Sequence, residues 1–148
     1  MQGEISRQNA LRYILAGNAI ITMKNISTGN RFTYKISKLK KKYQQTNKST
    51  DIYWVRVLTC PNNTRGYRFF GTVFVNGSVN FKVSNKSKIS KDAQSVRVFH
   101  YCLYHLTKND LSDDVKFYHE GYCGRCGRLL TVPESIVAGY GPICINLI

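Results

Sequence analysis

Four side chains near the carboxyl end of the chain are of the types that bind zinc: His119, Cys123, Cys126 and Cys144. A Cys-x-x-Cys pair lets one tight turn direct two thiolates at the same ion, and the glycines around it allow close backbone approach. Cys144 supplies a third thiolate, and His119 can complete a tetrahedron. Because a hydrolytic zinc site keeps one position open for water, this closed set predicts one structural zinc ion. The alternative is that His119 only ends a strand and the fourth ligand lies elsewhere.

Length and composition indicate a folded protein. The chain has 148 residues, of which 43% are hydrophobic and 12% aromatic, so it can bury the core of one compact domain. No apolar run approaches the roughly 18 residues that span a bilayer, and the amino end lacks the uninterrupted apolar stretch of a secretory signal. The two cysteines outside the zinc set, Cys60 and Cys102, stand alone and are expected to be buried thiols. This cysteine usage favours a reducing cytoplasm, and we expect no membrane partner.

The formal charge of +14 is distributed unevenly along the chain. Residues 1–50 hold ten Lys or Arg against one acidic residue, and residues 51–110 hold nine against three. Residues 111–148 hold three against four, so the cysteine segment is nearly neutral. A polyanionic partner is therefore expected to meet the first two thirds of the chain, while the metal segment braces the fold.

The densest basic stretch runs from Lys35 to Tyr43 and is interpreted as a strand end that continues into a polar loop. Its lysines can neutralise phosphates, and Tyr43 can stack on a base. Further arginines follow among aromatic residues. The predicted nucleic-acid-binding residues are Lys35, Lys38, Lys40, Lys41, Lys42, Tyr43, Arg56, Arg65 and Arg68. The alternative is a solvated loop that has no partner and only keeps the protein in solution.

Period-two alternation and turn residues predict an α+β fold. Five antiparallel strands are expected at residues 19–24, 31–36, 52–58, 67–75 and 79–83, with polar glycine-containing turns between them. Apolar spacing predicts helices over residues 6–16, capped by Ser6, and over residues 92–109, capped by Asp92. A last strand at 115–119 leads into the cysteines, and residues 133–138 form a short helix. The prediction is an antiparallel sheet of about five strands with one or two packed helices and a carboxyl-terminal zinc knuckle. Residues 1–114 form a basic domain, and residues 115–148 form the knuckle segment packed on it.

The run His-Glu-Gly-Tyr-Cys-Gly-Arg-Cys-Gly-Arg-Leu-Leu-Thr-Val-Pro-Glu-Ser-Ile, followed by Gly-Tyr-Gly-Pro-Ile-Cys, covers residues 119–144. It resembles an uncharacterised family of zinc-knuckle domains common in bacteriophage genomes. Residues 15–20 and 28–35 are similar, more loosely, to what precedes the knuckle in phage members. The resemblance implies zinc at the cysteines and a phage origin, and hence the cytoplasm of a bacterial host. It implies no activity.

These observations favour a small zinc-binding protein that binds DNA or RNA without catalysis through a basic, aromatic-rich β surface. A second hypothesis is an inhibitor that contacts a host nucleic-acid-handling or defence protein, or a ribonucleoprotein. An enzyme is the least favoured class, and its candidate acids are Asp110, Asp113 and Asp114. No phosphate-binding glycine loop, paired acid and base, or open zinc site is recognisable in the sequence.

Overall fold

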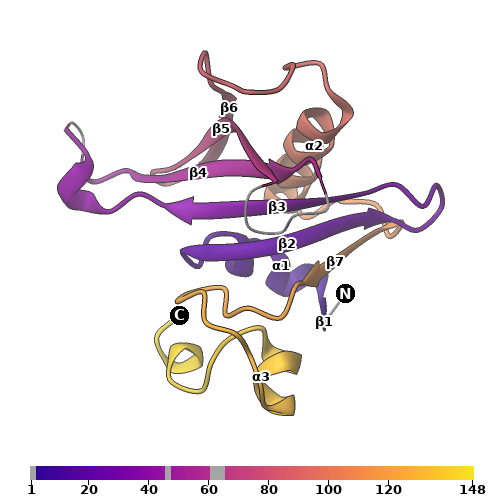
Figure 1. Ribbon diagram of the computed structural model, residues 1–148, viewed down its shortest axis with the longest axis vertical. Helices are drawn as coiled ribbons and strands as arrows, with labels where there is room; N and C mark the ends of the chain where they lie inside the picture. The colour runs from indigo at the N-terminus through magenta and orange to yellow at the C-terminus, as the bar shows by residue number, and fades with distance from the viewer. Residues whose placement is uncertain (1–2, 46–47, 61–65) are drawn as a thin grey trace.

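The computed structural model describes residues 3–45, 48–60 and 66–148, and these form an α+β fold around one antiparallel sheet (Figure 1). Within the described residues the sheet has seven strands in the order β1-β7-β2-β3-β4-β5-β6. The strands are β1 (Gly3–Ile5), β2 (Asn18–Asn25), β3 (Arg31–Lys38), β4 (Asp51–Leu58), β5 (Tyr67–Val75), β6 (Val79–Val83) and β7 (Val115–His119). The helices are α1 (Arg7–Ile14), α2 (Gln94–Lys108) and α3 (Pro133–Ala138), with short 3-10 turns η1 (Lys41–Tyr43) and η2 (Cys144–Asn146).

The two longer helices pack on the same face of the sheet. In β3, Tyr34 and Lys38 lie on the same face, because side chains alternate along a strand and these two residues are an even number of positions apart. Lys38 pairs with Tyr53 of β4, so Tyr34 and Tyr53 also share this face. The Tyr34 hydroxyl donates to the carbonyl of Ser95 in α2 at 2.6 Å. The Tyr53 hydroxyl donates to the carbonyl of Leu15 after α1 at 2.9 Å. The buried core therefore lies between this face and the two helices.

The opposite face, which we call the open face, is covered by neither α1 nor α2. Two rows of paired residues cross β3, β4 and β5 on it. One row contains Lys35, Arg56 and Phe69, and the other contains Ser37, Trp54 and Thr72. All six side chains are at least partly exposed. The sheet thus presents cations and aromatic rings side by side on a surface that the core does not use.

The predicted strand count of about five was too low. Strand β1 has only three residues, too few to show a period-two pattern, and it pairs with β7. Strand β7 also pairs with β2, so the predicted knuckle segment, residues 115–148, begins with a strand of the main sheet. The predicted cap of the second helix was also wrong, because Ala93 occupies the N-cap position and no side chain caps it. The other predicted strands and helices are confirmed to within a few residues of their ends.

In the part of the chain that the structure describes, no helix is long and apolar enough to cross a membrane.

Candidate metal centre and basic groove

The backbone between Tyr122 and Leu129 folds into a tight turn that we call the knuckle turn. These two residues form an isolated antiparallel bridge, and the Cys123 amide donates to the carbonyl of Arg128 at 2.8 Å. The amide of Gly127, at a φ of 80°, donates back to the Cys123 carbonyl at 2.9 Å. Because a left-handed φ favours glycine, the Cys-Gly-Arg-Cys-Gly sequence itself specifies this turn.

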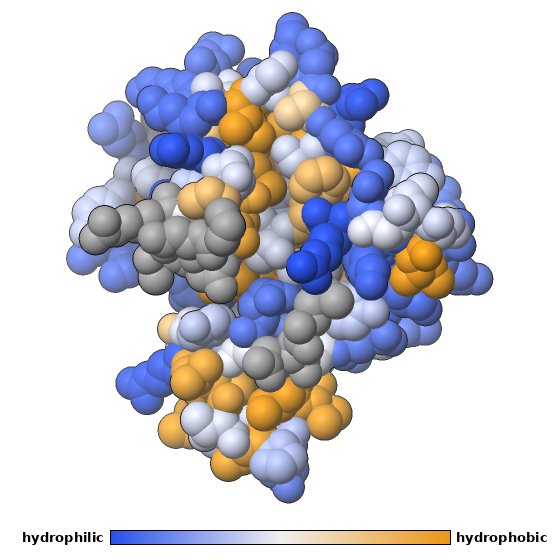
Figure 2. Space-filling view, turned by 45° about the vertical axis from the view of Figure 1, so that its right-hand side comes forward, coloured by the Kyte–Doolittle hydropathy of each residue, from blue (hydrophilic) through white to orange (hydrophobic). Residues whose placement is uncertain are grey.

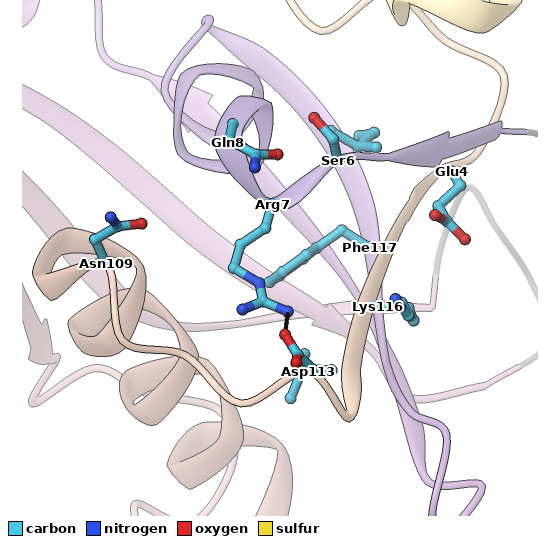
Figure 3. A pocket seen from close by; sticks show the side chains of 10 residues that line it. Glu4, Ser6, Arg7, Gln8, Asn109, Asp113, Lys116 and Phe117 are labelled. Atoms are coloured by element: carbon cyan, nitrogen blue, oxygen red, sulfur yellow. Dashed lines mark hydrogen bonds and ion pairs between the residues drawn. The ribbon is translucent and has the colours of Figure 1, made fainter.

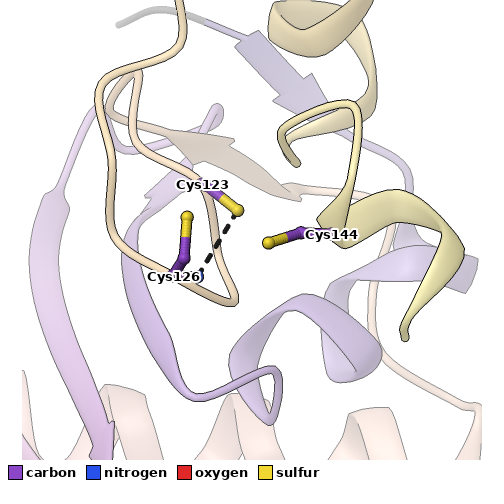
Figure 4. A group of neighbouring side chains, drawn as sticks. All are labelled: Cys123, Cys126 and Cys144. Atoms are coloured by element: carbon purple, nitrogen blue, oxygen red, sulfur yellow. Dashed lines mark hydrogen bonds between the residues drawn. The ribbon is translucent and has the colours of Figure 1, made fainter.

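The thiols of Cys123, Cys126 and Cys144 converge on one point, and we call them the thiol cluster (Figure 4). Their sulfur atoms all lie within 4.8 Å of one another. Zinc–sulfur bonds of about 2.3 Å in a tetrahedron place sulfurs about 3.8 Å apart, so the spacing fits a tetrahedral ion after small adjustments. Cys123 and Cys144 are buried, while Cys126 is exposed. Cys144 arrives from η2, after α3 has ended at Gly139 in the left-handed conformation.

Backbone amides favour the thiolate form of Cys123, whereas the neighbouring thiols raise the pKa of Cys126. Burial raises the pKa of the Cys123 thiol, but backbone N–H groups of Cys126, Gly141 and Arg125 outweigh it and lower the pKa to about 7. The Cys126 amide donates to the Cys123 sulfur at 3.5 Å. The Arg125 guanidinium lies 3.7 Å from the Cys144 sulfur. Since the thiolate is the metal-binding form, this donor set can hold a metal ion.

The His119 side chain lies outside the thiol cluster. It is completely buried, and its Nδ1 accepts a hydrogen bond from the Gly121 amide at 3.0 Å. Its Nε2 therefore carries the proton and donates to the carbonyl of Ile136 at 2.5 Å. Both ring nitrogens are thus used by backbone groups, one in the turn and one in α3. In this arrangement the ring ties α3 to the end of β7, and metal ligation would require one of these bonds to break.

The knuckle turn is attached to the first part of the chain through the junction of α1 and β2. The Tyr13 hydroxyl donates to the Tyr122 carbonyl at 2.8 Å, and the Tyr13 ring packs against Tyr140 with ring centroids 5.6 Å apart. The Asn18 amide donates to the Gly124 carbonyl at 2.8 Å. A Cβ on Gly124 would lie 2.5 Å from the Tyr13 ring, so only glycine fits against it. The thiol cluster therefore lies in a segment that these contacts already hold against the sheet.

A second feature lies at the end of the open face, where β3 and β4 meet the η1 loop. It is an open groove of about 800 Å³, which we call the basic groove. Its lining residues are Asn18, Lys35, Ser37, Lys38, Leu39, Lys40, Tyr43, Trp54 and Arg56. Five of the predicted nucleic-acid-binding residues are thus brought to one surface: Lys35, Lys38, Lys40, Tyr43 and Arg56.

The cations around the groove fall into two groups. Lys41 and Lys38 share the carboxylate of Asp51, at 2.8 and 3.5 Å. The hydrogen bond from Lys41 holds the pKa of the Asp51 carboxyl below its ordinary value. In contrast, no ion pair with a carboxylate is found in the described residues for four other cations: Lys35, Lys40, Lys42 and Arg56. Sequence spacing could not show this difference, because Asp51 lies on the next strand.

Three of these cations lie over aromatic rings. The Lys42 ammonium lies 5.1 Å from the centre of the Tyr43 ring, and the Lys35 ammonium lies 5.8 Å from that of Tyr67. The Arg56 guanidinium lies 5.7 Å from the centre of the Trp54 ring. Such contacts are worth about 0.5–1 kcal/mol at exposed sites and hold each cation near its ring. Charge and π surface are therefore next to each other along the groove.

The other four predicted residues are not among those that line the groove: Lys41 and Lys42, which lie beside it in η1, and Arg65 and Arg68. Arg68 pairs with Val57, which places it on the face opposite Arg56. Arg65 lies outside the described residues. Trp54, in contrast, was not among the predicted binding residues, although it is 41% exposed and lines the groove. The available signal was the two-residue spacing of Trp54 and Arg56, which puts both on one face of a strand.

Two of the three candidate acids of an enzyme, Asp113 and Asp110, make local side-chain contacts. A pocket of about 360 Å³ beside the start of α1 is crossed by an ion pair of 2.6 Å between Arg7 and Asp113 (Figure 3). Arg7 also donates to the carbonyl of Leu111 at 2.7 Å, so it ties α1 to the connection between α2 and β7. Asp110 contacts His105 at 2.7 Å. These carboxylates serve as local ties.

Apolar side chains gather on the surface of the carboxyl-terminal segment, residues 115–148, at the bottom of Figure 2. The most exposed is Val137, at 81%. The other large hydrophobic residues exposed there are Tyr122, Leu129, Val132, Ile143, Ile145, Leu147 and Ile148. This surface differs in character from the basic groove. The protein surface thus has a cationic region at the basic groove and a nearly neutral, apolar region on the carboxyl-terminal segment.

Fold and site together define an α+β protein with three converging thiols that can hold a metal ion, and an open basic groove on the sheet. Residues 114–145 match the model of a family of unknown function, DUF6011. The match contains the whole thiol cluster and begins just before β7. No curated protein and no solved structure matches the chain significantly.

Proposed function

We propose that this protein binds nucleic acid without catalysis, through the basic groove and the neighbouring open face of the sheet. The observation that carries the proposal is the convergence of Lys35, Lys40 and Arg56 with exposed aromatic rings in one groove. Cations that neutralise phosphates release condensed counterions, which drives binding that is independent of sequence. Stacking on aromatic rings adds affinity that is equally tolerant of sequence.

The same proposal assigns zinc to the thiol cluster. Cysteine thiolates are typical ligands of structural zinc, and together with a fourth ligand these three would form a closed set in which the ion holds the knuckle turn against η2. His119 stays the predicted fourth ligand. A His119→Gln variant separates two roles, because ligation by the imidazole predicts loss of the metal. A purely structural role in binding Ile136 predicts retained metal with a lower melting temperature.

A direct test of the groove uses fluorescence anisotropy with labelled oligonucleotides of unrelated sequence. The double variant Lys40→Ala/Lys42→Ala should bind at least tenfold more weakly than the unaltered protein, because it removes two cations for which the described residues provide no carboxylate partner. The matched control is Arg97→Ala/Lys108→Ala, which removes the same charge from the exposed side of α2. Equal weakening in both variants would show that only total charge matters and would reject the groove as the site.

A second candidate function is contact with a host protein, acting as an inhibitor of nucleic-acid handling or defence. The apolar surface of the carboxyl-terminal segment favours it, since exposed apolar patches often mark protein interfaces. The resemblance to phage proteins would place such an encounter in a bacterial host. Affinity capture from bacteria, repeated after nuclease treatment, separates the candidates. A stoichiometric protein that survives the nuclease supports the second, and loss of all bound material supports the first.

A further inference from the structure

Two exposed rings line the basic groove together with its lysines. Tyr43, in η1, is 62% exposed, and Trp54, in β4, is 41% exposed. Trp54 packs edge-to-face with Phe69, with ring centroids 6.3 Å apart, and the Arg56 guanidinium lies 5.7 Å from the centre of the Trp54 ring. These contacts hold the indole in place while leaving much of it accessible. An exposed indole that is fixed in position, and that the core does not need, is available to a ligand.

The geometry around these rings favours bases that are not paired. In a duplex the faces of the bases are stacked on one another, so an aromatic side chain reaches them only after unstacking. A groove on a sheet offers rings on which unpaired bases can stack, with cations beside them for the phosphates. The helices α1 and α2, which would otherwise be candidates to enter a major groove, pack on the other face.

We propose that the basic groove takes a single-stranded segment of DNA or RNA, with one base stacked on Trp54 and the flanking phosphates next to Lys35, Lys40 and Arg56. This inference rests on the proposed function, and it adds the form of the nucleic acid and the stacking residue. Trp54 lines the groove and pairs with Ser37, two residues along β3 from Lys35, which pairs with Arg56. The indole ring would therefore stack on the flat face of a base, and because every base has such a face, binding would not depend on sequence.

Trp54 is the only tryptophan in the chain, so the intrinsic fluorescence of the protein reports on this residue alone. The experiment titrates the protein with a twelve-nucleotide oligothymidine, with a duplex of the same length, and with inorganic polyphosphate, while recording tryptophan emission. Stacking predicts strong quenching by the single strand, and little by polyphosphate, which binds by charge and has no bases. The duplex should bind at least tenfold more weakly than the single strand.

Variants at this position provide the second measurement. Trp54→Ala should weaken single-strand binding by about ten- to a hundredfold, and Trp54→Phe should restore most of the loss. Tyr101→Ala, which removes an exposed ring from α2, should leave binding unchanged. Circular dichroism of each variant shows whether the fold is retained.

The possible outcomes separate this inference from the proposed function. Salt-sensitive binding of oligonucleotides without quenching, with Trp54→Ala unchanged, would overturn the stacking inference and leave nucleic-acid binding in place. Equal or tighter binding of the duplex would overturn the preference for single strands. Failure of every oligonucleotide to bind at low salt would overturn the proposed function itself.

Discussion

The dependence of oligonucleotide affinity on salt can be worked out from the ion pairs around the basic groove. Four cations there have no carboxylate partner among the described residues: Lys35, Lys40, Lys42 and Arg56. Each phosphate neutralised on a single strand contributes about 0.7 to the slope of log affinity against log salt. Four such contacts predict a slope of about 3, which corresponds to about 50-fold weaker binding at 200 mM than at 50 mM salt.

The perturbation that tests this number is Lys40→Ala. It removes one of the four cations that have no carboxylate partner in the described part of the chain, so the slope should fall by about 0.7 and the loss of affinity over the same salt range should shrink to about 18-fold. The assay is fluorescence anisotropy with an end-labelled single-stranded oligonucleotide at 50, 100 and 200 mM potassium chloride. Affinity at the lowest salt should fall as well, because a phosphate contact is lost.

The control is Lys108→Ala, which removes the same charge from the last turn of α2. Its slope should equal that of the unaltered protein, because Lys108 lies on the helix that covers the other face. Identical slopes for Lys40→Ala and the unaltered protein would refute the assignment of Lys40 to the phosphate site. A slope below about 1 for the unaltered protein would refute the counterion argument altogether.

Three further outcomes follow from the same structure. Cys126→Ser should reduce bound metal from about one equivalent to near zero, measured by elemental analysis, because it removes a thiolate from the cluster. Gly124→Ala should destabilise the protein by about 1–3 kcal/mol and lower its melting temperature by roughly 3–10 °C, because the new Cβ would overlap Tyr13. Asp51→Asn should remove a contribution to stability of at most about 1 kcal/mol, measured as a difference from the unaltered protein that is present near neutral pH and disappears as the pH is lowered. The sign follows from the lowered pKa of Asp51: its contribution is present above the pKa of the unfolded state and is lost as the pH falls through that of the folded state.

Each of these predictions has its own control. Cys60 is exposed, so the prediction that it is buried was wrong, and it lies outside the cluster. Cys60→Ser should therefore keep its metal, and metal loss there would point to general unfolding. Gly141→Ala should be tolerated, since nothing lies within 4 Å of its Cβ position. An equal effect of the two glycine variants would contradict the packing argument. If Asp51→Asn and the unaltered protein lose stability in parallel down to pH 2, the ion pair to Lys41 contributes nothing measurable.

Much of the sheet was predictable because its strands alternate between buried and exposed residues. The β2–β3 hairpin shows why: Ala19, Ile21 and Met23 are buried on one face, and Asn25 and Gly29 provide the turn. Strand β1 was not predictable from this signal, because three residues do not define a period. Its existence depends on β7, which follows it by more than a hundred residues and pairs with it edge to edge.

The candidate sites divide in the same way. The Cys-x-x-Cys turn is local, and the sequence predicted the convergence of all three thiols. The position of His119 is not local, because the carbonyl of Ile136 reaches its ring only after α3 has packed beside β7. The excess of positive charge could be counted from the sequence. Strand register, however, decided that Arg56 lies on the open face of the sheet and Arg68 on the opposite face.

The sequence by itself therefore determined what depends on neighbouring residues: the strand pattern, the knuckle turn and the excess of positive charge. Only the tertiary structure decided which of the described cations pair with a carboxylate, since Asp51 meets Lys38 and Lys41 through packing of β4 beside β3 and its loop. It also decided that Trp54 lines the groove. The physical reason is that a side chain's face and its partners are set by hydrogen-bond register between strands, which no single stretch of sequence contains.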